Sequence, residues 1–181
     1  MRRRTMFTSE DDRVPVVYKR PNLMRRRLIF IEGLDHCGKS TLYRRAEQES
    51  GHDVSFHDRG LLGRVAYAKL FKEDYPLEDV LALELALISV DAYAIIFLDP
   101  DVRELHRRIE ADPEHRSISM EMLCRTRMHY SAEFEYRKVA PYNMRTECLL
   151  RIDNTDMSPD DVVQQVLSWT GSTWLGGELA E

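Results

Sequence analysis

The stretch Gly33-Leu34-Asp35-His36-Cys37-Gly38-Lys39-Ser40 decides the fold of this 181-residue chain. It matches the pattern G-x-x-x-x-G-K-[ST] in full. An apolar run at 28–31 precedes it, and residues 39–50 carry helical spacing. The glycines let backbone N–H groups turn inward, and the helix N-terminus adds partial positive charge. The stretch therefore predicts a phosphate-binding loop between a strand and a helix; a purely structural glycine-rich turn is the alternative.

The rest of the chain alternates short apolar runs with helical patterns. Strands are predicted at 54–57, 94–98 and 148–152, and helices at 61–72, 77–89, 101–111, 119–138 and from Ser158 to about Trp169. This alternation predicts an α/β fold in three layers, with a parallel sheet of about four to five strands and helices on both faces. The helix at 77–89 is apolar nearly all round, so we expect 81–88 to be core, with a dimer face as the alternative.

Composition indicates a globular chain with a real core. Hydrophobic residues make up 43% and charged residues 31%, which excludes a disordered chain. No apolar run is long enough to cross a bilayer, and the polar N-terminus lacks the apolar core of a secretory signal. The three cysteines are far apart, so a disulfide framework is not expected. We therefore expect a cytoplasmic protein without a membrane partner.

Charge is distributed unevenly along the chain. Residues 1–27 hold nine basic and three acidic residues, whereas 28–181 hold 17 basic and 28 acidic ones. The body is therefore not a general nucleic-acid binder, but the basic arm can touch nucleic-acid phosphates. We expect a basic, flexible extension at 1–27, one domain at 28–170 and a frayed tail at 171–181. An upstream start or a purification scar is another interpretation of the extension.

Several segments together resemble the thymidylate kinases and their deoxynucleoside kinase relatives. They are Phe30 to Asp35 with Gly38 to Thr41, Asp58-Arg59, Leu98-Asp99-Pro100, Arg125 to Tyr130, and Ile152 to Thr155. The resemblance covers about residues 28–168 and implies a P-loop kinase fold. It also implies an enzyme of nucleotide metabolism that transfers the γ-phosphoryl group of ATP, with Mg²⁺, to a nucleotide or nucleoside. A thymidylate-like deoxynucleoside monophosphate is the expected acceptor.

The phosphate-loop motif and this resemblance together assign residues to the nucleotide and the metal. We expect ATP to contact Gly33, Asp35, His36, Cys37, Gly38, Lys39, Ser40, Thr41, Asn154 and Thr155. Lys39 supplies a charge to the β- and γ-phosphates, and the Ser40 hydroxyl binds Mg²⁺. Asp58 supports Mg²⁺ through water or orients the acceptor. Cys37 stands before a helix N-terminus, which predicts a lowered thiol pKa, although a small loop residue is the plainer interpretation.

Further catalytic candidates are acidic or arginine side chains. By resemblance, Arg59 holds the acceptor's phosphate or its 5′ side; a surface ion pair of Asp58 and Arg59 is the alternative. Asp35 either binds a sugar hydroxyl or acts as a base, unless it is a mere loop variation. A lid is expected near 107–118, in which Arg107 and Arg116 stabilise the transferred charge. The other candidates, for which a solvated helix face is the alternative, are Arg103, Arg108, Arg125 and Arg127.

One departure from the family pattern leaves the acceptor open. Only 18 residues separate Lys39 from Asp58, where thymidylate kinases hold another strand and an Arg-Glu-Pro segment. The site can therefore open to a larger acceptor, such as a hydroxymethylated base or an end within DNA, guided by the basic arm. A third hypothesis is an ATP-binding module that regulates a partner without turnover. A homodimer is a further expectation.

Overall fold

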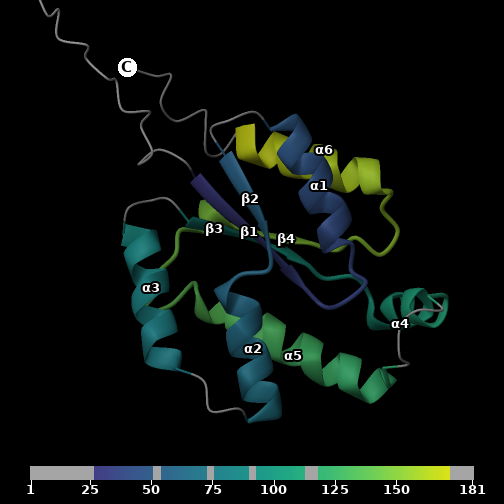
Figure 1. Ribbon diagram of the computed structural model, residues 1–181, viewed down its shortest axis with the longest axis horizontal. Helices are drawn as coiled ribbons and strands as arrows, with labels where there is room; N and C mark the ends of the chain where they lie inside the picture. The colour runs from purple at the N-terminus through teal and green to yellow at the C-terminus, as the bar shows by residue number, and fades with distance from the viewer. Residues whose placement is uncertain (1–26, 51–53, 73–75, 90–92, 113–117, 172–181) are drawn as a thin grey trace, which may run out of the picture.

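Four parallel strands form one sheet, so that their carboxyl ends lie along the same edge (Figure 1). The computed structural model describes residues 27–50, 54–72, 76–89, 93–112 and 118–171. Within these residues the strands follow the spatial order β2-β1-β3-β4. They are β1 (Arg27–Gly33), β2 (Val54–Asp58), β3 (Tyr93–Leu98) and β4 (Leu149–Ile152). The sheet thus confirms the predicted parallel arrangement and strand number.

In the described part of the chain, helices cover both faces of the sheet (Figure 1). One face carries α1 (Lys39–Glu49) and α6 (Pro159–Trp169), and the other carries α2 (Leu61–Phe71), α3 (Leu77–Ser89) and α5 (Met120–Tyr136). Beyond the carboxyl end of β3, α4 (Val102–Glu110) packs against α5, and a 3₁₀ turn, η2 (Thr146–Cys148), leads into β4. Every predicted boundary lies within two residues of the observed one. No described helix has the length and apolar character needed to span a membrane.

The strands are apolar runs because helices cover them on both sides. Every residue of β3 is buried, and Ile29 and Ile31 of β1 are fully buried beside it.

Helix α6 begins where the sequence predicts. The Ser158 hydroxyl accepts the N–H of Asp161, whose carboxylate accepts the N–H of Ser158 in return, and Pro159 occupies the first helical position.

The expectation that residues 81–88 form core holds only in part: Leu81, Leu85, Leu87 and Ile88 pack half-buried against the core. Within α3 only Val80 and Glu84 are buried, and Leu83 is 52% exposed. The helix packs along α2 with one stripe facing the body, and an apolar pattern does not say how much of a helix its neighbours cover. A dimer interface on the exposed apolar side of α3 stays a prediction.

The buried carboxylate of Glu84 belongs to an ionic cluster that the sequence pattern did not reveal. Arg137 is fully buried and contacts Glu84 twice, with Nη2–Oε2 at 2.8 Å and Nε–Oε1 at 3.2 Å. Its Nη1 donates to Glu133 Oε2 at 2.9 Å, and Tyr93 donates its hydroxyl to Glu84 Oε1 at 2.7 Å. The Arg137 guanidinium also lies 4.8 Å from the Tyr142 ring centre. These contacts tie α3, β3 and the end of α5 together.

We predict that Arg137→Met destabilises the protein by about 3–5 kcal/mol, because Glu84 then stays buried without its counter-charge. The matched control is Lys138→Met, which removes an exposed pair with Glu135 and should cost less than about 1 kcal/mol. Urea denaturation of both variants gives the comparison. A loss below about 1 kcal/mol for Arg137→Met would contradict a stabilising role of the cluster.

Candidate functional site

The loop from Gly33 to Ser40 wraps into a concave cradle at the carboxyl edge of the sheet. Gly33 (φ 145°) and Gly38 (φ 99°) adopt backbone conformations that side chains disfavour. A Cβ at Gly33 would lie 2.6 Å from both the Leu98 carbonyl oxygen and Cys37 Sγ, so the loop needs glycine there. Lys39 is only 6% exposed and donates its ammonium to the carbonyl of Leu34. The cradle therefore holds a cation at its base.

A cavity of about 530 Å³ opens over this cradle. Lys39, Arg59 and the N-terminus of α1 make it electropositive, and Asp35 is an acidic group in its wall. Its lining residues are Asp35, His36, Gly38, Lys39, Ser40, Thr41, Arg59 and Ile118. We call it the phosphate cavity. The structure thus brings six of the predicted loop residues together with Arg59, which lies outside the motif.

Asp58 and Arg59 each contact the loop rather than each other. Ser40 donates its hydroxyl to Asp58 Oδ2 at 2.7 Å, and Arg59 Nη2 lies 2.5 Å from Asp35 Oδ1. Arg59 itself adopts a left-handed conformation (φ 70°), fixed by its N–H, which donates to the Ile31 carbonyl at 3.0 Å. These contacts replace the surface ion pair that was the alternative interpretation.

The oxygen atoms of Ser40 and Asp58 suit a magnesium ion. Mg²⁺ takes oxygen ligands and is commonly held by one or two protein groups together with phosphates and water. A hydroxyl and a carboxylate 2.7 Å apart beside the phosphate cavity match that donor set. No cluster of three or more His, Cys, Asp or Glu side chains suited to a metal occurs in the described residues.

A second cavity, of about 470 Å³, adjoins the first through Arg59. Its walls are Asp58, Arg59, Gly60, Gly63, Arg64, Tyr67 and Tyr130. We call it the acceptor-side cavity, after the role proposed for it below. The Tyr67 and Tyr130 rings meet edge to face at 5.8 Å, and burial raises the pKa of Tyr67 to about 12, which keeps its hydroxyl neutral. Arg64 is exposed and its guanidinium has no partner among the described residues.

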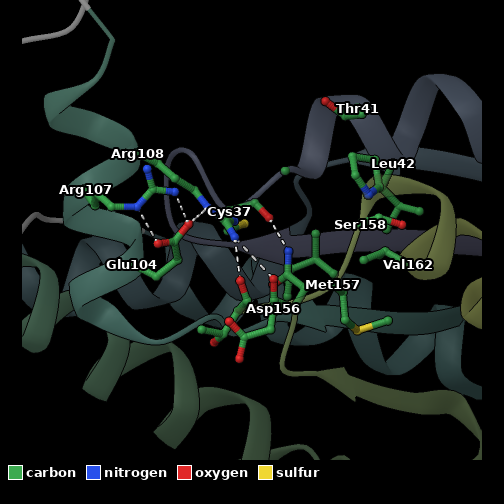
Figure 2. Close-up of a pocket in the computed structure, with 15 residues that line it drawn as sticks. Cys37, Thr41, Leu42, Glu104, Arg107, Arg108, Asp156, Met157, Ser158 and Val162 are labelled. Carbon is green, nitrogen blue, oxygen red and sulfur yellow. Dashed lines mark hydrogen bonds and ion pairs between the residues drawn. The ribbon is translucent and has the colours of Figure 1, made fainter.

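A third cavity, of about 570 Å³, lies on the other side of the loop (Figure 2). Figure 2 shows Glu104, Arg107 and Arg108 of α4 along one side, with Leu42 and Val162 on the opposite side. We call it the base cavity, after the role proposed for it below. Also lining it are Cys37, Gly38, Thr41, Leu98, Asn154, Thr155, Asp156, Met157, Ser158 and Pro159.

Hydrogen bonds fix the polar wall of the base cavity. Asn154 donates its side-chain amide to the Cys37 carbonyl at 2.8 Å, which ties the loop after β4 to the cradle. Arg108 Nη2 donates to the Thr155 carbonyl at 3.1 Å. Glu104 accepts from Arg107 and Arg108, and those hydrogen bonds lower its pKa to about 2. Glu104 is therefore ionised at neutral pH.

The structure places the candidate catalytic arginines at different positions, most of them away from the phosphate cavity. Arg107 lines the base cavity, paired with Glu104, and not the phosphate cavity. Arg127 is bound to Asp99, with Nε–Oδ1 at 2.6 Å. Arg103 and Arg125 are exposed and line none of the three cavities. Arg116 and the rest of 113–117, five of the twelve residues of the expected lid, lie outside the described residues, as does the arm before Arg27. Among the candidate arginines that the structure describes, only Arg59 therefore lies at the phosphate cavity.

The prediction of a lowered thiol pKa at Cys37 is wrong. The side chain is fully buried, and burial raises the pKa of this thiol despite the nearby Lys39 ammonium. Its sulfur packs beneath the loop against Gly33. The interpretation as a small loop residue agrees with this position.

Glu32 is a residue of the site that sequence reasoning did not assign. It precedes the loop on β1, is fully buried, and accepts the N–H groups of Gly60 at 2.8 Å and Gly63 at 3.1 Å. Burial raises its pKa from 4.5 to about 7, against the lowering effect of those two N–H groups. The available signal was a single acid directly after the apolar run 28–31 of the strand.

Comparisons with known proteins identify the fold. No protein-family model matches the chain, and no curated protein sequence does. Among solved structures it is similar to the YorR protein from Bacillus subtilis in complex with phosphorylated GDP, with TM-score 0.60 and 18% identity over 78% of this chain and 94% of that one.

Two further solved structures are similar to this chain. Thymidylate kinase from Candida albicans has TM-score 0.55 and 14% identity over 82% of this chain and 92% of that one. Deoxyadenosine kinase from M. mycoides with bound dCTP has TM-score 0.56 and 13% identity, over 80% and 99% respectively. At such identities the likeness shows the fold alone. The chain has the three-layer α/β fold of the P-loop nucleotide and nucleoside kinases, as the resemblance implied.

Proposed function

We propose that the protein is a kinase that transfers the γ-phosphoryl group of ATP to a thymidylate-like deoxynucleoside monophosphate. One observation carries the proposal: Arg59 lines both the phosphate cavity and the acceptor-side cavity. A donor phosphate and an acceptor phosphate can therefore meet at one guanidinium. Phosphoryl transfer is catalysed chiefly by such positioning and by stabilisation of charge on the transferred group.

On the donor side, the base cavity takes the adenine and the cradle takes the phosphates. Asn154 and Thr155 flank the base on one side and Arg107 on the other. The backbone N–H groups between Gly33 and Thr41 bind phosphate oxygens, and Lys39 leaves the Leu34 carbonyl to bind the terminal phosphates. Ser40 and Asp58 would hold Mg²⁺, which supplies charge neutralisation at the phosphates when bound.

On the acceptor side, two arginines favour an acceptor that carries a phosphate. Arg59 and Arg64 both line the cavity, and Arg64 is unpaired within the described residues. An acceptor phosphate is already ionised near neutral pH and needs no general base, so Asp35 has the simpler task of holding Arg59 or a sugar hydroxyl. Tyr67 and Tyr130 provide aromatic surface for the base.

One observation favours a second acceptor class, a hydroxymethylated base or an end within DNA. Among the described residues no strand lies between α1 and β2 in the sequence, and β2 is the outermost strand of the sheet, paired with β1 alone. A strand of nucleic acid would then approach the acceptor-side cavity from this edge.

We predict that the protein transfers the labelled phosphoryl group of ATP to dTMP more efficiently than to thymidine. Lys39→Ala should lower the rate of this transfer at least about 100-fold, because the positive charge at the transferred group is lost. A screen of deoxynucleoside monophosphates, deoxynucleosides and hydroxymethylated DNA measures both effects. Transfer confined to DNA and weakened by salt would select the second class instead. ATP binding without turnover of any acceptor would refute the kinase and leave a regulatory module.

We also predict that Arg59→Ala raises the KM for the acceptor about 10-fold or more, because a hydrogen bond to a charged group contributes about 1.5–3 kcal/mol. Arg64→Ala should raise it by a smaller factor, since its exposed charge is partly screened. The matched control is Arg44→Ala, an exposed arginine of α1 outside all three cavities. Equal acceptor KM values for Arg59→Ala and Arg44→Ala in steady-state kinetics would contradict the assignment.

A further inference from the structure

We infer that Glu32 is a positioning residue for the acceptor: its carboxyl group fixes the turn that carries Arg59. The inference rests on the proposed function, since Arg59 is taken to bind the acceptor. Glu32 stands on β1 directly before the phosphate loop and is 0% exposed. Its Oε1 accepts the N–H of Gly60, which follows Arg59, and the N–H of Gly63 in the first turn of α2.

The turn at 58–63 has no local means of satisfying these N–H groups. The N-cap of α2 is Gly60, which has no side chain to accept the free N–H groups of the first turn. Glu32 supplies that acceptor from another element. Together with the bond from the Arg59 N–H to the Ile31 carbonyl, two consecutive residues of β1 hold the turn through three hydrogen bonds. Arg59, in its left-handed conformation, depends on such tertiary contacts.

Gly63 is the position that lets the carboxyl group approach. A Cβ there would lie 2.7 Å from Glu32 Oε2 and 2.6 Å from the Tyr130 hydroxyl oxygen. Gly63 and Tyr130 also line the acceptor-side cavity, so the Glu32 contact lies immediately behind that wall. Displacing a binding group by about 1 Å can cost a catalyst about 100-fold in rate. A substitution at Glu32 therefore alters acceptor binding by displacing the turn that carries Arg59.

The electrostatics of Glu32 give the inference a readout independent of activity. Oε2 has no hydrogen-bond partner among the described residues, and burial holds the pKa near 7. The groups that interact electrostatically with Glu32 are the Gly60 and Gly63 N–H groups, the Lys39 and Arg137 cations and the hydroxyls of Tyr67, Tyr93 and Tyr130. Because the folded pKa exceeds the unfolded value, the carboxyl group stabilises the fold most below pH 4.5. That contribution is lost as pH rises through about 7.

The test compares Glu32→Ala with Glu32→Gln in steady-state kinetics. Glu32→Ala should raise the acceptor KM at least 10-fold while the KM for ATP changes less than 3-fold. Glu32→Gln should keep the acceptor KM within 3-fold, because its amide oxygen can accept both N–H groups. It should also lack the loss of stability that the wild-type protein shows as pH rises from 4.5 to about 7. The matched control is Glu47→Ala: Glu47 also accepts a backbone N–H, from Phe56, but lines none of the cavities. An unchanged acceptor KM in Glu32→Ala would overturn the inference.

Hydrogen exchange of the Gly60 and Gly63 amides tests the same contact without any substrate. Exchange should be at least 10-fold faster in Glu32→Ala than in Glu47→Ala, and unchanged rates would overturn the inference. If Glu32→Ala does not fold, Gly63→Ala serves in its place, since the added Cβ must push Glu32 and α2 apart. If the wild-type protein phosphorylates no acceptor, the proposed function fails, and the exchange rates alone decide whether Glu32 holds the turn.

Discussion

The parallel register between β1 and β2 is the constraint on which the whole site depends. It pairs Ile31 with Asp58, so the phosphate loop that follows β1 and the turn that follows β2 leave the sheet side by side. Ser40 then meets Asp58, and Asp35 meets Arg59, across two loops that are about 20 residues apart in the chain. A slip of one residue would turn every side chain of β2 to the opposite face and separate these pairs.

Buried carboxylates give that arrangement its rigidity. Glu32 holds the turn before α2, Glu84 binds Arg137 beneath α3, and Asp99 binds Arg127 and Arg151 at the end of β3. Each joins elements that are distant in the sequence, and each would be costly to leave unpaired. Helices α2, α3 and α5 are therefore fixed against the sheet by directional contacts as well as by apolar packing.

These contacts between sheet and helices also fix the positions of the three cavities relative to one another. The cradle, with the Lys39 ammonium group at its floor, lies between the base cavity and the acceptor-side cavity, which arginine and tyrosine line. In the proposed function these cavities hold the base, the phosphates and the acceptor in that order, so the γ-phosphoryl group would pass from the cradle to the acceptor-side cavity. Arg59 lies where the phosphate and acceptor-side cavities meet, in the turn between β2 and α2, and its N–H is held by the Ile31 carbonyl of β1.

The amino-acid sequence by itself determined the strands, the helices and the phosphate loop, because periodicity, glycine placement and the Gly-Lys-Ser ending of the loop are local properties. Only the tertiary structure decided that Glu32 reaches Gly60, 28 residues away, that α3 is mostly exposed, and that Arg107 faces the base cavity. These features depend on which elements pack together and on how far each side chain is buried by its neighbours. A local sequence pattern determines neither, because burial and pairing arise between segments that are distant in the chain.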